Sequence, residues 1–200
     1  GESIAPTNEL ALKSSMDFYN AFHIKPDWRS LDDYFKRLES VHPAINLGTY
    51  VGAGQVRQMI VGTENRAVTP DELKKMQEIV EQAMRDGAMG VSTSLIYAPD
   101  NYASTDELVA LAKAAAPYGG VYATHMRSEG ATEFEALDEA FRIGREAHVP
   151  VEIFHLKVLG RDYWGAMPKV VEAIEKARAS GLDVTADQYP YVGAATSLSA

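Results

Sequence analysis

The chain has 200 residues, of which 46% are hydrophobic and 24% charged, and this composition is typical of globular proteins rather than disordered or fibrous ones. Its mean hydropathy is -0.20, and charge or glycine interrupts every apolar run well before the ~20 residues that a membrane helix needs. The 28 acidic and 19 basic residues give a net charge of -9, which disfavours nucleic acids and anionic membranes as partners. We therefore expect a protein that acts on a small molecule.

Cysteine is absent, so the chain can supply no disulfide, thiolate nucleophile or Cys ligand to a metal. The sequence starts at Gly1 without a methionine and stops at Ala200 in a stretch rich in glycine, alanine and serine. We therefore expect both ends to be cut points within a longer polypeptide.

The predicted elements begin with a loop-rich lead-in, residues 1–43, whose aromatic-rich part predicts one or two helices. Residues 44–200 predict a series of alternating strands and helices. The strands are short and rich in valine, isoleucine and alanine, as expected for parallel strands covered on both faces. Strands are predicted at residues 44–51, 88–93, 120–125, 150–155 and 182–187, and helices at residues 70–86, 105–118, 132–147 and 167–180.

Capping residues mark the start of three of these helices. Thr69 precedes a proline and lies three residues before a glutamate, and Ser104 with Glu107 forms a capping box. Thr132 with Glu135 repeats that pattern. Glycines at positions 87, 119 and 181 mark helix ends.

The strands recur about every 30 residues, which is the repeat of a βα unit and predicts an α/β fold with a parallel sheet. A doubly wound sheet and a (β/α)8 barrel both fit this pattern. No G-x-G-x-x-G motif follows any of the predicted strands, which weakens a dinucleotide-binding interpretation. A complete barrel needs roughly 250 residues, so the chain is either an open sheet or the middle of a barrel.

Two histidines end consecutive predicted strands, His125 and His155. Consecutive parallel strands are usually neighbours about 4.8 Å apart, so both imidazoles should emerge side by side at the carboxyl edge of the sheet, where α/β enzymes place their active sites. Paired imidazoles suit zinc, which in a catalytic site takes a third protein ligand and an open position for water. The alternative is that each histidine only forms hydrogen bonds at a strand end.

Other polar residues follow the same strand ends. Arg127, Lys157 and Arg161 either attract an anionic substrate or are solvated loop charges. Asp187 is a metal ligand, a general base or a cap of the turn that follows it. His148 precedes a strand and is expected at the opposite edge with a structural role.

Several segments of the sequence resemble a known family. Residues 51–62 (VGAGQVRQMIVG), 87–130 (with GVYATHMRSEG at the end), 151–165 (VEIFHLKVLGRDYWG) and 182–198 (LDVTADQYPYVGAATSL) are similar to the N-acyl-D-amino-acid deacylases, or D-aminoacylases, of the amidohydrolase superfamily. The ordered combination of these segments is far more specific than any one motif.

The resemblance implies a metal-dependent (β/α)8 TIM barrel of the amidohydrolase type, present here as a partial barrel of about strands 3 to 7. It implies hydrolysis of the amide bond of N-acyl-D-amino acids, releasing a carboxylate and a D-amino acid. It also implies a tightly bound zinc ion, with room for a second. His125 and His155 match the family's metal ligands at the ends of the fifth and sixth barrel strands.

The same resemblance places the remaining machinery outside the chain. A third metal ligand, Cys or Glu in the family, would lie just upstream of Gly1, and the absent cysteine points to a carboxylate. The general-base Asp is expected beyond Ala200, so no catalytic residue is assigned within the 200 residues and the chain alone is expected to be inactive. Tyr97, Lys157 and Tyr189 are implied to line the substrate pocket, with Tyr189 near the amino-acid carboxylate.

The expected ligand is therefore a small anionic N-acyl amino acid, and neither a nucleic acid nor a membrane. The expected protein partner is the remainder of the same polypeptide or a second copy, because an open half-barrel exposes unpaired strand edges. Two alternatives stay open: a dihydroorotase- or hydantoinase-like cyclic amide hydrolase, and a catalytically incomplete barrel segment.

Overall fold

Five parallel strands form one sheet in the computed structural model of the chain, which describes residues 1–196. The strands are β1 (Val51–Gly52), β2 (Gly90–Ser94), β3 (Val121–His125), β4 (Val151–Leu156) and β5 (Val184–Gln188). The helices are α1 (Glu9–Ala21), α2 (Leu31–Ser40), α3 (Ala53–Val61), α4 (Pro70–Arg85), α5 (Thr105–Ala115), α6 (Glu133–Ala147) and α7 (Met167–Ala179). Residues 197–200, the last part of the family resemblance, lie outside the described residues.

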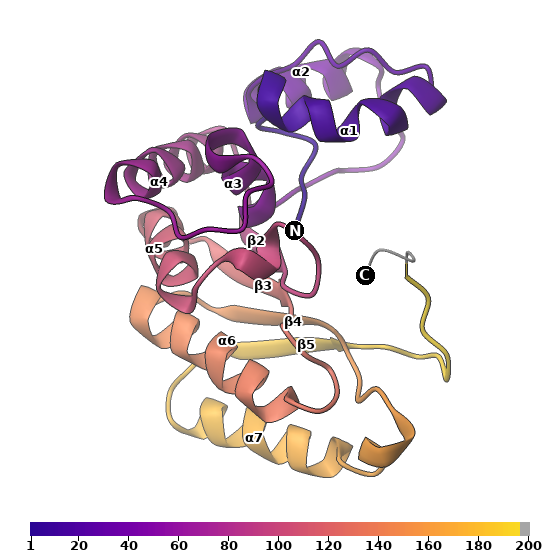
Figure 1. Ribbon diagram of the computed structural model, residues 1–200, viewed down its shortest axis with the longest axis vertical. Helices are drawn as coiled ribbons and strands as arrows, with labels where there is room; N and C mark the ends of the chain where they lie inside the picture. The colour runs from indigo at the N-terminus through magenta and orange to yellow at the C-terminus, as the bar shows by residue number, and fades with distance from the viewer. Residues whose placement is uncertain (197–200) are drawn as a thin grey trace.

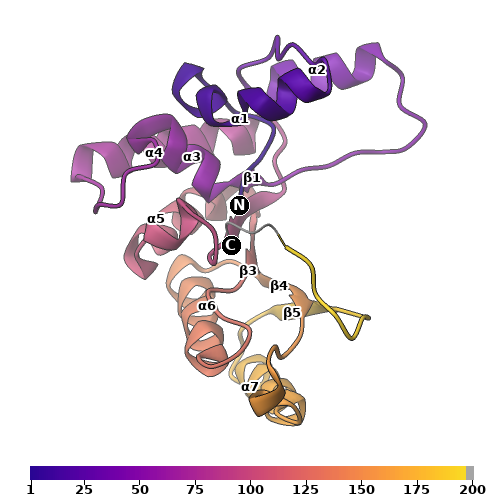
Figure 2. The ribbon, with the colours of Figure 1, turned by 45° about the vertical axis from the view of Figure 1, so that its right-hand side comes forward.

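The strands lie in the sheet in the order of the sequence, β1-β2-β3-β4-β5, and each neighbouring pair is parallel. Helices α4 to α7 connect successive strands and all lie on the same side of the sheet (Figures 1 and 2). A doubly wound sheet would reverse its strand order and carry helices on both faces. The sequential order and the single helical layer are those of a section of a (β/α)8 barrel, which confirms the predicted fold class.

Strands β2 to β5 begin and end within two residues of the predicted limits, but the strand predicted at 44–51 was wrong. Only Val51 of that stretch pairs with the sheet, because residues 44–48 are exposed and Ile45 is 71% accessible. Helix α3 was not predicted. It has no side-chain N-cap and is held instead by the burial of Val56 and Val61.

The predicted capping box of α4 is present, only half of that of α5 forms because the Glu107 carboxylate binds Arg57 instead, and the predicted cap of α6 is absent. Thr69 and Glu72 form a capping box, and Ser104 Oγ accepts from the Glu107 N–H at 3.2 Å. Thr132 forms no side-chain cap, because its φ of -119° and ψ of 38° are not extended. Its own N–H donates to Ser128 Oγ at 3.3 Å, so a loop contact replaces the predicted cap.

One glycine controls the close approach of β2 to β3. Gly90 has a φ of 147°, and a Cβ atom there would lie 2.0 Å from the carbonyl oxygen of Val121. Because glycine has no side chain, β2 can pair closely with β3. Strand β2 leads to the loop of Tyr97, and β3 carries His125.

The lead-in segment shares the hydrophobic core with the βα units. Leu12, Tyr19, Trp28 and Leu31 are buried in the same cluster as the sheet residues. The proposed division at residue 43 stays a prediction. None of the helices described here combines the length and apolar character that crossing a membrane requires.

Candidate metal centre

His125 and His155 lie next to each other at the carboxyl edge of the sheet, as predicted from their positions on consecutive strands. His125 is the last residue of β3, and His155 is the penultimate residue of the neighbouring β4. Their ring centroids are 4.5 Å apart, and His125 Nδ1 lies 2.8 Å from His155 Nε2. The two nitrogens face each other at hydrogen-bonding distance, so a metal ion bound by both would require the rings to move slightly apart.

His155 is aimed by an irregularity at the end of β4. The register of β4 against β5 shifts between Ile153 and Leu156, and His155 has a φ of 41°. Its backbone N–H donates to Asp187 Oδ1 at 2.5 Å instead of entering the sheet ladder. The Asp187 carboxylate thus holds the backbone of the neighbouring strand, a contact that was not among the roles considered for it.

Glu129 is a functional candidate that the sequence did not single out. Its side chain is 4% exposed, and its Oε1 lies 3.0 Å from His155 Nδ1 and accepts from Lys157 Nζ at 2.5 Å. Its Oε2 lies 4.0 Å from His125 Nε2. The sequence does place a glutamate four residues after a strand-end histidine. Glutamate is also common in surface loops, so this spacing did not indicate a site.

The residues present fit a divalent cation. One donor atom from each of His125, Glu129 and His155 lies within 4.8 Å of the others. Burial lowers the pKa of His125 to about 4, so its imidazole is neutral at neutral pH, which is the form that binds a metal. His125 Nε2 is buried without a hydrogen-bond partner in the described part of the chain.

The three residues predicted to line a substrate pocket surround this pair. The ring of Tyr97 lies 5.8 Å from that of His125, and the ring of Tyr189 lies 6.4 Å from that of His155. Lys157 Nζ lies 4.8 Å from the Tyr189 ring centroid and also donates to the His155 carbonyl at 2.9 Å. Proximity is thus observed for all three, while their roles stay predictions.

Two hollows are lined by the residues whose rings neighbour the histidines. One, of about 450 Å³, is lined by Tyr97, Ser94 and Asp100 among others. The second, of about 500 Å³, contains Lys157, Tyr189 and residues of both adjoining loops. Tyr97 thus lines one hollow, and Lys157 and Tyr189 line the other.

The two arginines considered as anion ligands differ in their surroundings. Arg127 donates to both carboxylate oxygens of Glu139 and to the carbonyls of Asn101 and Ala103, so it braces loops. The Arg161 guanidinium lies 6.0 Å from the ring centroid of Trp164, in the wall of the second hollow.

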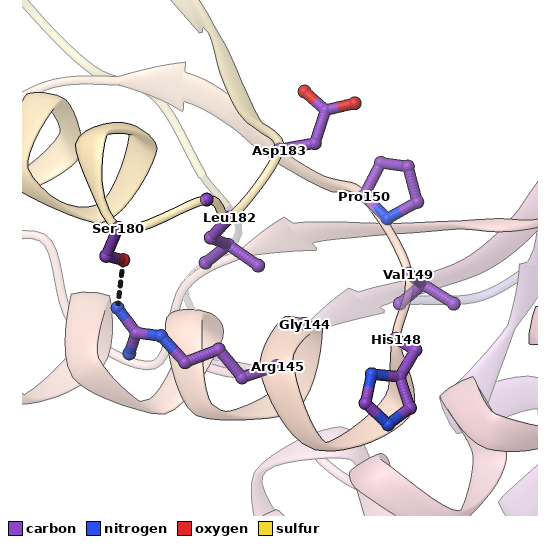
Figure 3. Close-up of a pocket in the computed structure, with 9 residues that line it drawn as sticks. Gly144, Arg145, His148, Val149, Pro150, Ser180, Leu182 and Asp183 are labelled. Atoms are coloured by element: carbon purple, nitrogen blue, oxygen red, sulfur yellow. Dashed lines mark hydrogen bonds between the residues drawn. The ribbon is translucent and has the colours of Figure 1, made fainter.

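A pocket of about 370 Å³ lies at the opposite edge, around the amino ends of β4 and β5. Figure 3 shows His148 and Asp183 there, with Arg145 donating to Ser180 Oγ at 3.4 Å. His148 ends α6 with a φ of 57°. In barrels, residues at this amino-terminal edge support stability, whereas active sites lie at the other edge.

Glu133, in the first turn of α6, is buried, and neither of its carboxyl oxygens has a hydrogen-bond partner within residues 1–196. Burial raises the pKa of Glu133 to about 7, and the Glu129 carboxylate adds to the rise. The ordinary value is about 4.3, so between these pH values the folded protein holds a proton that the unfolded chain has released. Stability from this proton is complete below about pH 4 and is lost as the pH rises through the folded-state pKa.

Glu133→Gln is expected to remove this pH dependence. Between pH 5.5 and pH 8, the unfolding free energy of the wild type should fall by about 1–2 kcal/mol more than that of the variant, measured by chemical denaturation with a chelator present. Glu135→Gln, an exposed glutamate of the same turn, is the control and should behave like the wild type. Identical pH profiles for the wild type and Glu133→Gln would contradict the prediction.

Known proteins resemble this chain over four fifths of its length. It is 40% identical to the D-aminoacylase of Alcaligenes xylosoxydans xylosoxydans over 166 residues, which are 83% of this chain and 34% of that protein. No established protein-family profile matches it. The chain thus spans about a third of the length of the curated relatives it matches.

Solved structures agree with this relationship. A crystal structure of D-aminoacylase, which defines a subset of amidohydrolases, superposes with a TM-score of 0.79 at 42% identity, covering 82% of this chain and 35% of that chain. The N-acyl-D-glutamate deacylase of Bordetella bronchiseptica, complexed with zinc and a phosphonate inhibitor, gives 0.79 at 31% identity, covering 84% and 35%. A D-hydantoinase gives 0.55 at 14% identity, covering 82% and 38%, and shares only the fold. The predicted relationship is therefore confirmed, and the deacylases are favoured over the hydantoinase alternative.

Proposed function

We propose, from the premise that this chain belongs to the D-aminoacylase family of amidohydrolases, that it supplies the zinc-binding part of an enzyme acting on N-acyl-D-amino acids. The enzyme would hydrolyse the amide bond and release a carboxylate and a D-amino acid. The observation that carries this proposal is the pair of neighbouring imidazoles at the carboxyl edge, with nitrogens facing each other at 2.8 Å.

His125 and His155 would hold the zinc through these facing nitrogens. Zinc bound there would polarise the acyl carbonyl and lower the pKa of an attacking water. A carboxylate from outside the 200 residues would complete the ligand set, and the general-base Asp would also lie beyond Ala200. A second, weaker ion is part of the proposal because a related D-aminoacylase has a binuclear metal centre.

Lys157 and Tyr189 would hold the anionic end of the substrate. An ammonium has three N–H donors, and Glu129 and the His155 carbonyl take two of those on Lys157. The third, which points at His155 Nδ1 at 2.7 Å, would turn to a substrate carboxylate when that nitrogen carries the ring proton. Tyr189 lies beside this ammonium in the second hollow. Tyr97, on the His125 side, would then contact the other half of the substrate in the first hollow.

The remaining strands of the barrel would cover the open edges of the sheet. In the described structure β1 and β5 each have one strand neighbour, and residues 185–188 of β5 are exposed. We propose the rest of the same polypeptide as this partner, with residues 1–43 as a lead-in and residues 44–200 as the central βα units of the catalytic barrel. Association with a second copy of the chain would cover the same strand edges.

The full-length protein tests the activity. We expect release of free amino acid from N-acyl-D-amino acids, little release from the L enantiomers, and loss of activity on removal of zinc. A cyclic amide such as a hydantoin is the control substrate and should not be turned over. Hydrolysis of the hydantoin without hydrolysis of the N-acyl substrate would replace this proposal by the cyclic amide alternative.

A further inference from the structure

One buried carboxylate faces the outer nitrogens of both histidines. In the pair, His125 Nδ1 and His155 Nε2 face each other, so the outer nitrogens are His125 Nε2 and His155 Nδ1. Glu129 Oε1 lies 3.0 Å from His155 Nδ1, and Glu129 Oε2 lies 4.0 Å from His125 Nε2. The two oxygens of a single side chain are thus each directed at a different imidazole.

The position of the proton on each imidazole ring decides whether the pair can bind a metal. A metal binds the bare lone pair of a neutral imidazole, so a metal between the rings requires that neither facing nitrogen carries a proton. Each neutral ring must then carry its proton on the outer nitrogen. Both outer N–H groups need an acceptor, because His125 Nε2 is buried and lacks a partner among the described residues.

Lys157 favours the opposite tautomer of His155. Its Nζ lies 2.7 Å from His155 Nδ1, and donation to that atom would leave Nδ1 bare and place the ring proton on Nε2, facing His125. This tautomer blocks metal binding. Glu129 opposes it, because its carboxylate accepts from the ammonium at 2.5 Å and its Oε1 also lies 3.0 Å from Nδ1, within reach of a proton there.

We propose that Glu129 is a positioning residue for the metal ligands, accepting the outer N–H of both histidines and so fixing the tautomers in which their facing nitrogens are free to bind zinc. This inference rests on the proposed function, since it assumes that the pair holds a metal. Carboxylates that accept from a ligating histidine typically change metal affinity about 10–100-fold when they are removed.

The test compares three variants of the full-length protein without substrate. Glu129→Gln has the same shape but only one acceptor oxygen, and we expect it to weaken zinc binding about 10–100-fold in competition with a chromophoric chelator. Glu133→Gln changes a second buried carboxylate, four residues further along the chain, and should bind zinc like the wild type. Lys157→Met removes the competing donor, together with the bonds of Lys157 to Glu129 and the His155 carbonyl, and His155 should still carry its proton on Nδ1.

The tautomers are read directly from the imidazole nitrogen shifts in NMR spectra. In the zinc-loaded wild type, His155 should carry its proton on Nδ1 and His125 on Nε2, and metal-free Glu129→Gln should show His155 in mixed tautomers. Wild-type zinc affinity in Glu129→Gln, or metal coordination by His155 Nδ1, would overturn the inference alone. A wild type that binds no zinc would overturn the proposed function and this inference with it.

Discussion

Loss of either facing histidine is expected to remove bound zinc from the full-length protein. His125→Ala and His155→Asn should each lower zinc affinity by on the order of 100-fold or more, exceeding the loss seen when only an outer partner of a ligand is changed. Each imidazole supplies one of the facing nitrogens, so each substitution removes a metal ligand outright. Asparagine is chosen at position 155 because it tolerates the φ of 41° better than alanine does.

Zinc content after dialysis, together with release of D-amino acid from an N-acyl substrate, measures this loss, and both should fall in parallel. His148→Asn is the matched control, since this histidine also has a left-handed backbone, with a φ of 57°, but lies at the opposite edge of the sheet. It should retain zinc and activity. Zinc at the wild-type level in a variant that lacks both His125 and His155 would refute the site.

Replacement of Glu107 by alanine is expected to lower the free energy of unfolding by about 3–5 kcal/mol. Arg57 of α3 and Glu107 of α5 form a buried ion pair, with side chains 1% and 4% exposed. Arg57 Nη1 donates to both carboxylate oxygens at 2.8 Å, and Nη2 donates to the carbonyl of Arg66 at 2.5 Å. Without Glu107 a buried guanidinium charge would have no counterion, which costs far more than the loss of a surface pair.

Urea denaturation measures this effect, with Asp106→Ala as the control. Asp106 lies in the same turn of α5 as Glu107 and pairs with Arg142 of α6. These two side chains are 80% and 46% exposed, so the change should cost less than about 1 kcal/mol. The double variant Arg57→Met/Glu107→Leu should regain much of the lost stability because no charge is left unpaired. A loss in Glu107→Ala no greater than in Asp106→Ala would contradict the assigned role of the pair.

Much of the βα pattern could be predicted because its signals are local. Short apolar runs, helix periodicity and capping residues each depend on a few neighbouring positions, and strands β2 to β5 follow them. Helix α3 could not be predicted in this way, since it lacks a side-chain cap and buries polar residues such as Arg57, whose counterion lies 50 residues away. The apolar residues of 44–48 misled in the opposite direction: they suggested a buried strand, but they stay exposed in the structure.

The sequence by itself determined the residue types at the strand ends, and the rule that consecutive parallel strands are neighbours was enough to bring His125 and His155 together. Only the tertiary structure decided which nitrogens face each other and which carboxylates serve them. Glu129 meets Lys157 across 28 residues, and Asp187 meets the backbone of His155 across 32. The orientation of a loop side chain depends on contacts with strands that are distant in the sequence. Sequence spacing alone therefore does not predict which partner it contacts.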